Sequence, residues 1–167
     1  MVAFHNVLTC PLTQWSPHSI VDRDIRTGDV DTYQTAEHFM MAAKARCGGD
    51  ENARDRILIE TNLQTVKDMG GAVRYGLGPG QVPFTDWENL RERVVLLGNL
   101  LKFSQNPQAA NYLRSTGDKI LVEGSVRDRI WGCGINYLDP RIQDPNNWRG
   151  RNNLGHILME VRKLLGP

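Results

Sequence analysis

The chain has 167 residues and a formal net charge of +1, and 40% of its residues are hydrophobic while 23% are charged. This composition is ordinary for a globular protein, and the length fits one domain of the usual ~50–250 residues, so we predict a single domain over residues 1–167. The near-neutral charge excludes a broadly basic nucleic-acid coat protein. No apolar run approaches the ~20 residues of a membrane span and the N-terminal residues do not resemble an export signal, which together predict an intracellular protein, cytoplasmic or nuclear, without a membrane-bound part.

In chain order, the first third is rich in loops and has three short strand candidates, at residues 4–8, 19–21 and 30–33. Capping residues and glycine pairs then predict three short helices, at residues 35–46, 51–59 and 62–70. The glycine-rich segment at residues 76–80 looks like a phosphate-binding loop. It lacks the Lys-Ser/Thr of a P-loop and follows no clear strand, so we interpret it as a connector.

A capping box of Thr85 and Glu88 predicts the start of a long helix. Its predicted core stripe repeats at helical spacing and consists of Trp87, Leu90, Val94, Leu97 and Leu101. A short helix at residues 106–112 and a buried strand at residues 119–123 follow. A final helix has an apolar stripe of Leu154, Ile157, Leu158, Val161 and Leu164/Leu165. The predicted fold is therefore mainly α, of the α+β type, with several short helices, two longer ones and a few short strands.

The helix predicted at residues 35–46 places an acid and an amine on one face. Glu37 and Lys44 are seven residues apart, close to two helical turns, and Met41 lies between them. Such a face can supply an acid and a base at a glycosidic carbon. The alternative is that both are solvated residues on an Ala-rich helix, where a suitable charge pair contributes only about 0.2–0.5 kcal/mol.

The cysteines and histidines indicate no redox or metal chemistry. Three cysteines without Cys-x-x-Cys spacing favour reduced thiols, and Cys133 is interpreted as a small packed residue. The four histidines show no ligand spacing and the carboxylates are scattered, so neither a metal nor another cofactor is predicted.

Several separated sequence blocks agree in order and spacing with one family. They are the Tyr33-x-x-x-Glu37-His38 stretch, the Lys102-Phe103 pair, the Asp128-x-x-Trp131-Gly132 turn and the Asn-x-Leu-Gly-x-x-Leu-Met-x-x-Arg helix that ends at Arg162. The chain resembles the NADAR family, also called YbiA-like, over about residues 8–165. This resemblance implies an N-glycosidase, since members act on ribosylated pyrimidines of riboflavin synthesis or remove ADP-ribose from guanine. Both reactions break a bond between ribose C1 and nitrogen.

With this resemblance, Glu37, Lys44 and Asp128 become the predicted catalytic residues. A deprotonated Lys44 could form a Schiff base at ribose C1 while Glu37 moves protons, and Asp128 is placed to accept a hydrogen bond from a sugar hydroxyl. An alternative is water activated by Glu37. The predicted substrate-binding residues are Trp15, His38, Trp87, Trp131, Gly132, Asn136 and Arg149. His38 can instead be a packed residue with a hydrogen bond, and Arg149, with Arg141 and Arg151, can be solvated loop charge.

The N-terminal region departs from the common bacterial pattern of the family, Leu-Ser-Asn-Phe-Tyr-Pro, because this chain has Trp15-Ser16 where that pattern has Phe-Tyr. The change alters a predicted base-stacking element, although Trp15 can equally be a core residue. We therefore favour an ADP-ribosyl glycohydrolase whose partner is an ADP-ribosylated nucleobase or nucleic acid, with the guanine amino group as leaving group. The base should be single-stranded or extruded. No obligate protein partner is expected.

Two other functions remain possible from the sequence. One is an N-glycosidase that acts on phosphoribosylated pyrimidine intermediates of riboflavin synthesis, and the other is a non-catalytic module that binds NAD or ADP-ribose. A binding module needs stacking and phosphate contacts but has no use for an acid and an amine on one helix face.

Overall fold

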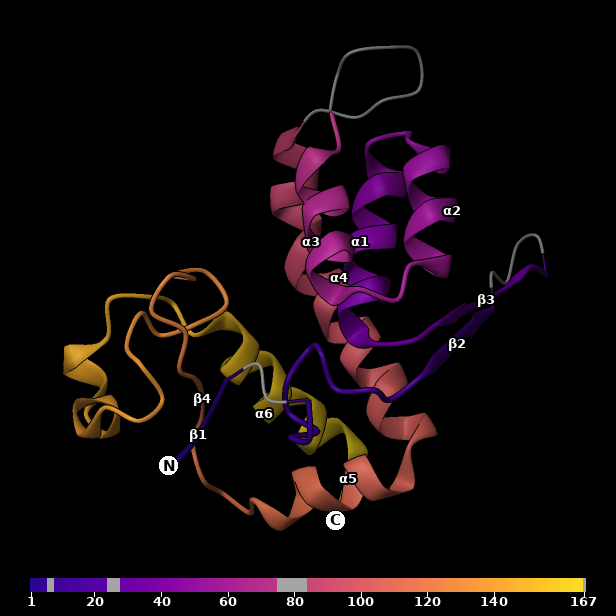
Figure 1. Ribbon diagram of the computed structural model, residues 1–167. Helices are drawn as coiled ribbons and strands as arrows, with labels where there is room; N and C mark the ends of the chain where they lie inside the picture. The colour runs from indigo at the N-terminus through magenta and orange to yellow at the C-terminus, as the bar shows by residue number, and fades with distance from the viewer. Residues whose placement is uncertain (6–7, 24–27, 75–83, 167) are drawn as a thin grey trace. The chain divides into compact units, whose positions relative to one another are not determined.

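The structure is a computed structural model that describes residues 1–5, 8–23, 28–74 and 84–166. The described residues contain six α-helices, four short β-strands and two 3₁₀-helices (Figure 1). The prediction of a mainly helical fold with few short strands is confirmed. The glycine-rich segment at residues 76–80 lies outside the described residues. No helix of the described part is both long enough and apolar enough to cross a membrane.

The chain divides into two compact units. The first unit comprises Met1–Ser16 and Asn106–Pro167, and the second unit comprises Pro17–Gln105. The expectation of a single domain over residues 1–167 stays a prediction.

The second unit is a helical cluster with one β-hairpin. In it, β2 (Ile20–Arg23) pairs antiparallel with β3 (Val30–Tyr33), and Ile20 lies opposite Tyr33. Its helices are α1 (Ala36–Cys47), α2 (Glu51–Ile59), α3 (Leu63–Ala72) and α4 (Phe84–Gln105). Of these, α1 contacts each of the other three (Figure 1). The hairpin and the three short helices agree with the sequence prediction to within about two residues at each end.

Helix α1 is the central element of the second unit because small residues let its neighbours approach it. Its N-cap Thr35 accepts a hydrogen bond from the backbone N–H of His38 at 3.4 Å. A Cβ on Gly70 of α3 would lie 2.1 Å from the Met41 sulfur, and one on Gly98 of α4 would lie 2.6 Å from the Phe39 ring. These glycines therefore admit α1 side chains that a larger residue would displace.

The buried face of α4 differs from the predicted stripe. Trp87 is buried as predicted, but Leu90 and Leu97 are 38% and 47% exposed. The other buried residues of α4 are Val95, Gly98, Asn99, Lys102 and Phe103. Val95 lies eight residues after Trp87, and from Val95 onward the buried residues recur at spacings of three and four, which place all of them on one side of the helix. The apolar pattern alone was ambiguous because α4 has leucine and valine on two faces.

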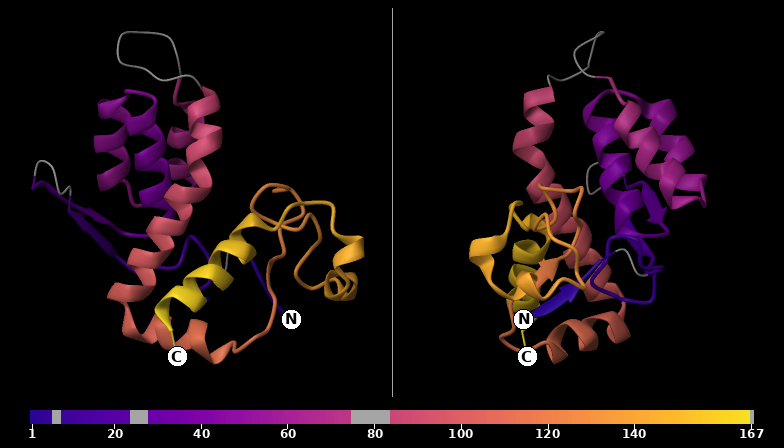
Figure 2. Two further views of the ribbon diagram at one scale, coloured as in Figure 1. Left: turned by 180° about the vertical axis from the view of Figure 1, so that it is seen from behind. Right: turned by 60° about the vertical axis from the view of Figure 1, so that its left-hand side comes forward.

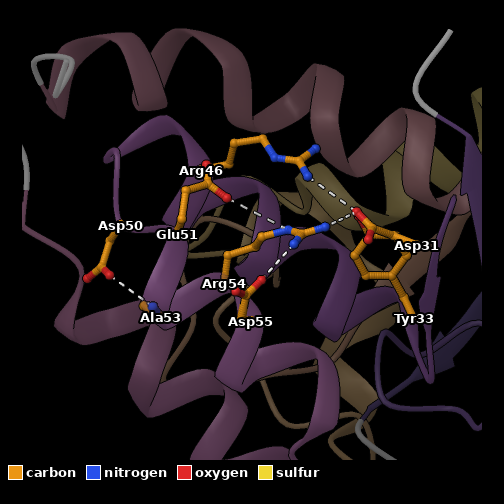
Figure 3. A network of polar contacts seen from close by, with 8 residues as sticks. All are labelled: Asp31, Tyr33, Arg46, Asp50, Glu51, Ala53, Arg54 and Asp55. Atoms are coloured by element: carbon orange, nitrogen blue, oxygen red, sulfur yellow. Dashed lines mark hydrogen bonds and ion pairs between the residues drawn. The ribbon is translucent and has the colours of Figure 1, made fainter. Parts of the chain in front are cut away.

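A polar network ties β3 to α1 and α2 in the second unit (Figure 3). The Asp31 carboxylate accepts hydrogen bonds from Arg54, from Arg46 at 3.2 Å and from the Tyr33 hydroxyl at 3.2 Å. Arg54 also donates to Asp55 at 2.6 Å. Burial of the Asp31 carboxylate opposes its ionisation, but the hydrogen bond and the charge of Arg54 outweigh burial and hold the pKa of Asp31 below its usual value.

Replacing Asp31 by asparagine should lower the free energy of unfolding at pH 7 by about 2–3 kcal/mol, because Arg54 and Arg46 lose the carboxylate that they share. Since the folded-state pKa of Asp31 is depressed, its contribution is present above the unfolded-state pKa of 3.8 and is lost as the pH falls through the folded-state pKa. Urea unfolding of both proteins at pH 7 and at acid pH checks this. A difference between them that does not shrink on acidification would contradict the assignment.

The first unit is built on a parallel strand pair. In it, β1 (Val2–Phe4) pairs with β4 (Leu121–Glu123), and Ala3 lies opposite Val122 (Figure 2). The remaining elements are α5 (Pro107–Ser115), the 3₁₀-helices η1 (Pro140–Gln143) and η2 (Pro145–Asn147), and α6 (Asn153–Leu165). The strand predicted at residues 4–8 overlaps β1 only at Phe4, and residues 6–7 of that prediction lie outside the described residues. The strand predicted at residues 119–123 begins two residues later, since Lys119 N–H closes a turn on Thr116 O.

A small apolar core lies beside this strand pair. It consists of Val122, Cys133, Ile135 and Ile142, and Trp148 packs against it half-buried. Burial raises the pKa of the Cys133 thiol, so this residue is a packed, unreactive cysteine, as predicted. In α6, Leu154, Leu158 and Val161 are buried as predicted, but Leu164 is exposed.

Candidate active site

Glu37 and His38 lie in the first turn of α1 and are both buried, with exposed fractions of 4% and 1%. Both ring nitrogens of His38 have protein partners. Nε2 lies 2.9 Å from Glu60 O and Nδ1 lies 2.8 Å from the Thr35 hydroxyl. Because a carbonyl can only accept, Nε2 carries a proton, and burial keeps the pKa of His38 below its usual value. His38 thus has the packed, hydrogen-bonded role that the sequence allowed, and its role in substrate binding stays a prediction.

Lys44 lies in the last turn of α1 and is half-buried. Burial lowers its pKa below the ordinary value, which increases the fraction of neutral amine near physiological pH. Met41, predicted as an apolar floor between Glu37 and Lys44, instead packs its sulfur against Gly70 of α3. The face between the acid and the amine is therefore partly a helix contact.

Lys102 is a further candidate functional residue, which the sequence interpretation used only as part of the Lys102-Phe103 family block. Its side chain is fully buried on α4, and its Nζ lies 5.1 Å from the centre of the Phe103 ring. Burial and the charge of Lys102 both lower the pKa of His18, whose Nδ1 is buried without a hydrogen-bond partner among the described residues. The available signal was a lysine within the apolar run Leu100-Leu101-Lys102-Phe103. Buried lysines are costly unless they have a partner or a function.

The tryptophans predicted to bind substrate differ in burial. Trp87 is 5% exposed on α4 of the second unit, whereas Trp15 and Trp131 are half-buried residues of the first unit. Ser16, which follows Trp15, is fully buried and donates its hydroxyl hydrogen to Thr13 O at 3.0 Å. Ser16, at the position where the chain departs from the family pattern, therefore closes a turn.

Asp128 organises the turn that contains Trp131. Its Oδ1 accepts hydrogen bonds from the backbone N–H groups of Ile130 at 2.9 Å and Trp131 at 2.8 Å. This is the geometry of an Asx turn, in which one carboxylate oxygen fixes the backbone. The other oxygen of Asp128 is the one available to a sugar hydroxyl, so the predicted catalytic role is compatible with the turn but is not its only purpose.

The loop after β4 is locked onto the N-terminal end of α6. The N–H groups of Asn152, Asn153 and Leu154 donate to carbonyls of Gly132, Ile130 and Trp131. A Cβ on Gly132 would lie 2.8 Å from Asp128 O, so this glycine is required for packing within the protein. The N–H groups of Cys133 and Gly134 donate to Glu123 O and Ser125 O. The backbone N–H groups of this loop are thus largely used inside the protein.

Asn152 holds this arrangement together. It is fully buried, adopts the left-handed backbone with φ of 52°, and its side-chain amide bonds to both ends of β4. Its Nδ2 donates to Leu121 O at 2.9 Å and its Oδ1 accepts from Glu123 N at 2.9 Å. The Glu123 carboxylate is also buried, and its Oε1 lies 2.5 Å from Nδ1 of His5.

The predicted site residues Asn136 and Arg149 come together in the first unit. Both line a cavity of about 200 Å³, together with Asp139 and Arg141. Asp139 is bound by Arg141, whose guanidinium lowers the pKa of that carboxyl to about 2. The structure thus brings Asn136 and Arg149 to one cavity although twelve residues separate them in the sequence.

The predicted site residues, taken together, belong to different units. Glu37, His38, Lys44 and Trp87 lie in the second unit, whereas Trp15, Asp128, Trp131, Gly132, Asn136 and Arg149 lie in the first. Within the second unit, Glu37 and Lys44 share α1. Within the first, Asp128, Trp131 and Gly132 share one turn. The prediction that both groups serve one active site stays a prediction. Among the described residues, no three His, Cys, Asp or Glu side chains gather as metal ligands.

Comparisons with known proteins match nearly the whole chain. The model of the NADAR domain matches residues 3–166. The chain belongs to the NADAR family. An N-glycosidase of Acanthamoeba polyphaga mimivirus is 34% identical over 151 residues, which cover 90% of this chain and 85% of that protein. The Zea mays chloroplastic riboflavin biosynthesis protein PYRR is 33% identical over 159 residues, but these cover 92% of this chain and only 23% of the maize protein.

A solved structure shows that the fold is YbiA-like. The NMR structure of Escherichia coli YbiA aligns with a TM-score of 0.70 and 23% identity, and the alignment covers 98% of this chain and 84% of that one. At this identity the match establishes the fold alone. Together with the family model, it confirms the NADAR resemblance read from the sequence.

Proposed function

We propose that this NADAR protein is an N-glycosidase that releases ADP-ribose from the amino group of a nucleobase, with guanine in DNA or RNA as the favoured base. The observation that carries the proposal is the pair on α1, a buried carboxylate at Glu37 and a half-buried amine at Lys44 whose pKa is lowered by burial. Perturbed groups of this kind cluster at catalytic sites. The N-glycosidase name of the mimivirus relative supports the bond type.

The proposed reaction begins at the aminal carbon of the substrate. The bond between ribose C1 and the ring oxygen breaks, Glu37 supplies the proton that makes this oxygen a hydroxyl, and C1 becomes a protonated imine of the guanine amine, which keeps its N–H. Neutral Lys44 then adds to C1. The C1–nitrogen bond to guanine breaks, and the amine leaves with the proton that Lys44 loses.

Water completes the proposed cycle. It adds to the Lys44 imine with Glu37 as base, the lysine amine is released, and the C1 aldehyde closes on the hydroxyl to give ADP-ribose. One water is consumed and one carbon–nitrogen bond is cleaved. Asp128, through its second oxygen, would hold a ribose hydroxyl. In the alternative route, Glu37 activates water directly and Lys44 stabilises charge.

The Zea mays relative favours a second candidate substrate. Its name refers to riboflavin biosynthesis, so a phosphoribosylated aminopyrimidine is the competing substrate. The same acid and amine would serve this reaction, because the pyrimidine is also attached to ribose C1 through an amine.

The test offers both substrates to the full chain. Guanine-ADP-ribosylated single-stranded DNA and a phosphoribosylaminopyrimidine are incubated in parallel, and release of ADP-ribose or ribose phosphate is followed for wild type and Glu37→Gln. We expect turnover of the DNA adduct and a loss of about 10²–10⁴-fold in the variant. Turnover of the pyrimidine alone would replace the proposed substrate, and turnover of neither with retained ADP-ribose binding would make the chain a binding module.

A further inference from the structure

The cavity beside Arg149 has the features of an anion site. Its volume of about 200 Å³ is below the ~300–1,000 Å³ typical of sites for whole drug-sized ligands, so it suits one charged group of a larger molecule. Its polar lining consists of two arginines, two asparagines and one aspartate, and Val126 and Ile135 form the apolar wall. All of these residues belong to the first unit.

The two arginines of this cavity differ in whether a carboxylate balances their charge. Arg141 donates from Nε and Nη2 to the Asp139 carboxylate, with the shortest distance at 2.7 Å, so its charge is balanced. The Arg149 side chain makes no hydrogen bond or ion pair with any residue in the described ranges. Arg149 therefore supplies a net positive charge and a free guanidinium fork at the cavity.

The backbone under Arg149 is fixed although its side chain is exposed. The N–H groups of Arg149 and Gly150 both donate to Cys133 O, at 2.8 and 2.9 Å. Gly134, with φ of +77°, lies against Arg149 so closely that a Cβ there would be 3.0 Å from the Arg149 Cβ. The main chain therefore anchors the Arg149 side chain at its Cα, which limits the backbone entropy lost when the guanidinium binds an anion.

Neutral donors complete the lining. The Asn136 Oδ1 accepts from Leu138 N at 2.9 Å, whereas its amide N–H groups have no partner among the described residues. On the other side, Asn147 donates to Arg141 O at 3.1 Å and the Trp148 indole donates to Ile142 O at 2.9 Å. These bonds hold the rim in shape, and Trp148 is fixed against the apolar core of the first unit.

We propose that this cavity is the phosphate subsite of the protein, in which Arg149 binds a phosphate group of the ribosyl substrate through its fork and Asn136 donates a further hydrogen bond. The inference rests on the proposed function for the identity of the substrate. A guanidinium fork matches two phosphate oxygens, and charge-assisted bonds of this type are about twice as strong as neutral ones. The phosphate belongs either to the diphosphate of ADP-ribose or to a ribose 5-phosphate.

Binding to the full chain is measured by titration calorimetry with pyrophosphate, ADP-ribose and ribose 5-phosphate. Arg149→Gln should weaken pyrophosphate binding about 10- to 100-fold. The affinity of Arg149→Lys for pyrophosphate should lie between those of wild type and Arg149→Gln, because lysine keeps the charge but lacks the guanidinium fork. Arg127→Gln is the matched control, since Arg127 is exposed on the loop between β4 and η1 and does not line the cavity; we expect less than a twofold change in affinity.

The three ligands separate the two sources of phosphate. If Arg149→Gln loses affinity for ADP-ribose but not for ribose 5-phosphate, the subsite binds the diphosphate of ADP-ribose. If it loses affinity for both, the phosphate subsite is shared by both substrate classes. Equal affinities of wild type and Arg149→Gln for pyrophosphate, or equal losses in Arg127→Gln, would overturn the proposal.

This outcome is distinguishable from failure of the proposed function. A protein that binds pyrophosphate through Arg149 but cleaves no ribosyl substrate would retain the subsite and lose the glycosidase. A protein that cleaves the DNA adduct with the same KM in wild type and Arg149→Gln would retain the glycosidase and lose the subsite. In an active protein, the subsite predicts a raised KM with little change in kcat.

Discussion

Replacing Lys44 by alanine should lower kcat for release of ADP-ribose by about 10³-fold, within the range expected when a nucleophile or proton-transfer group is removed. The physical reason is that the half-buried Lys44 amine has a lowered pKa and can add to ribose C1 as a neutral nucleophile. Single-turnover measurements on guanine-ADP-ribosylated single-stranded DNA check the value. Wild-type turnover should rise with pH until the lowered pKa of Lys44 is passed.

Two further experiments decide whether Lys44 acts covalently. Borohydride should trap ADP-ribose on wild type and leave Lys44→Arg unlabelled, because an arginine keeps the charge but does not form an imine. Peptide mapping of the adduct distinguishes Lys44 from the fully buried Lys102. The matched control is Lys67→Ala, an exposed lysine of α3, which should keep normal turnover and labelling. Normal turnover of Lys44→Ala, with no trapped adduct in wild type, would leave water activated by Glu37 as the route.

Replacing Asn152 by alanine should lower the free energy of unfolding by about 2–4 kcal/mol. The substitution leaves Leu121 O and Glu123 N, which are both buried in β4, without their side-chain partners. Each such group costs about 1–3 kcal/mol. Alanine also tolerates the left-handed backbone at φ of 52° less well than asparagine. Urea unfolding monitored by tryptophan fluorescence measures the change.

A second substitution separates the effect of the lost hydrogen bonds from the effect of the left-handed backbone. Asn152→Gly removes the same hydrogen bonds but accepts the left-handed backbone, so it should be less destabilising than Asn152→Ala by up to about 1 kcal/mol. Asn146→Ala is the control, because Asn146 is an exposed residue of η2. If Asn152→Ala is as stable as Asn146→Ala, the bonds of Asn152 to β4 do not contribute to stability.

The candidate site was only partly predictable from the sequence. The sequence identified Glu37, Lys44 and Asp128 through their spacing and their resemblance to the family blocks. It did not reveal that Asp128 uses one oxygen to fix the turn at Trp131, or that the Met41 side chain packs against Gly70 of α3. Nor did it distinguish Arg149 from Arg141, because only the folded loop shows which guanidinium has a carboxylate beside it.

By itself, the sequence determined the family, the mainly helical class and the positions of most helices. These features depend on local signals, such as the N-caps Thr35 and Asn62 and the proline that begins α5, which act over three or four residues. Tertiary structure alone decided that Lys102 is buried while Leu97 is exposed, and that Asn152 bridges β4. Burial and pairing are set by residues distant in the chain, because a side chain becomes desolvated only when another element packs over it.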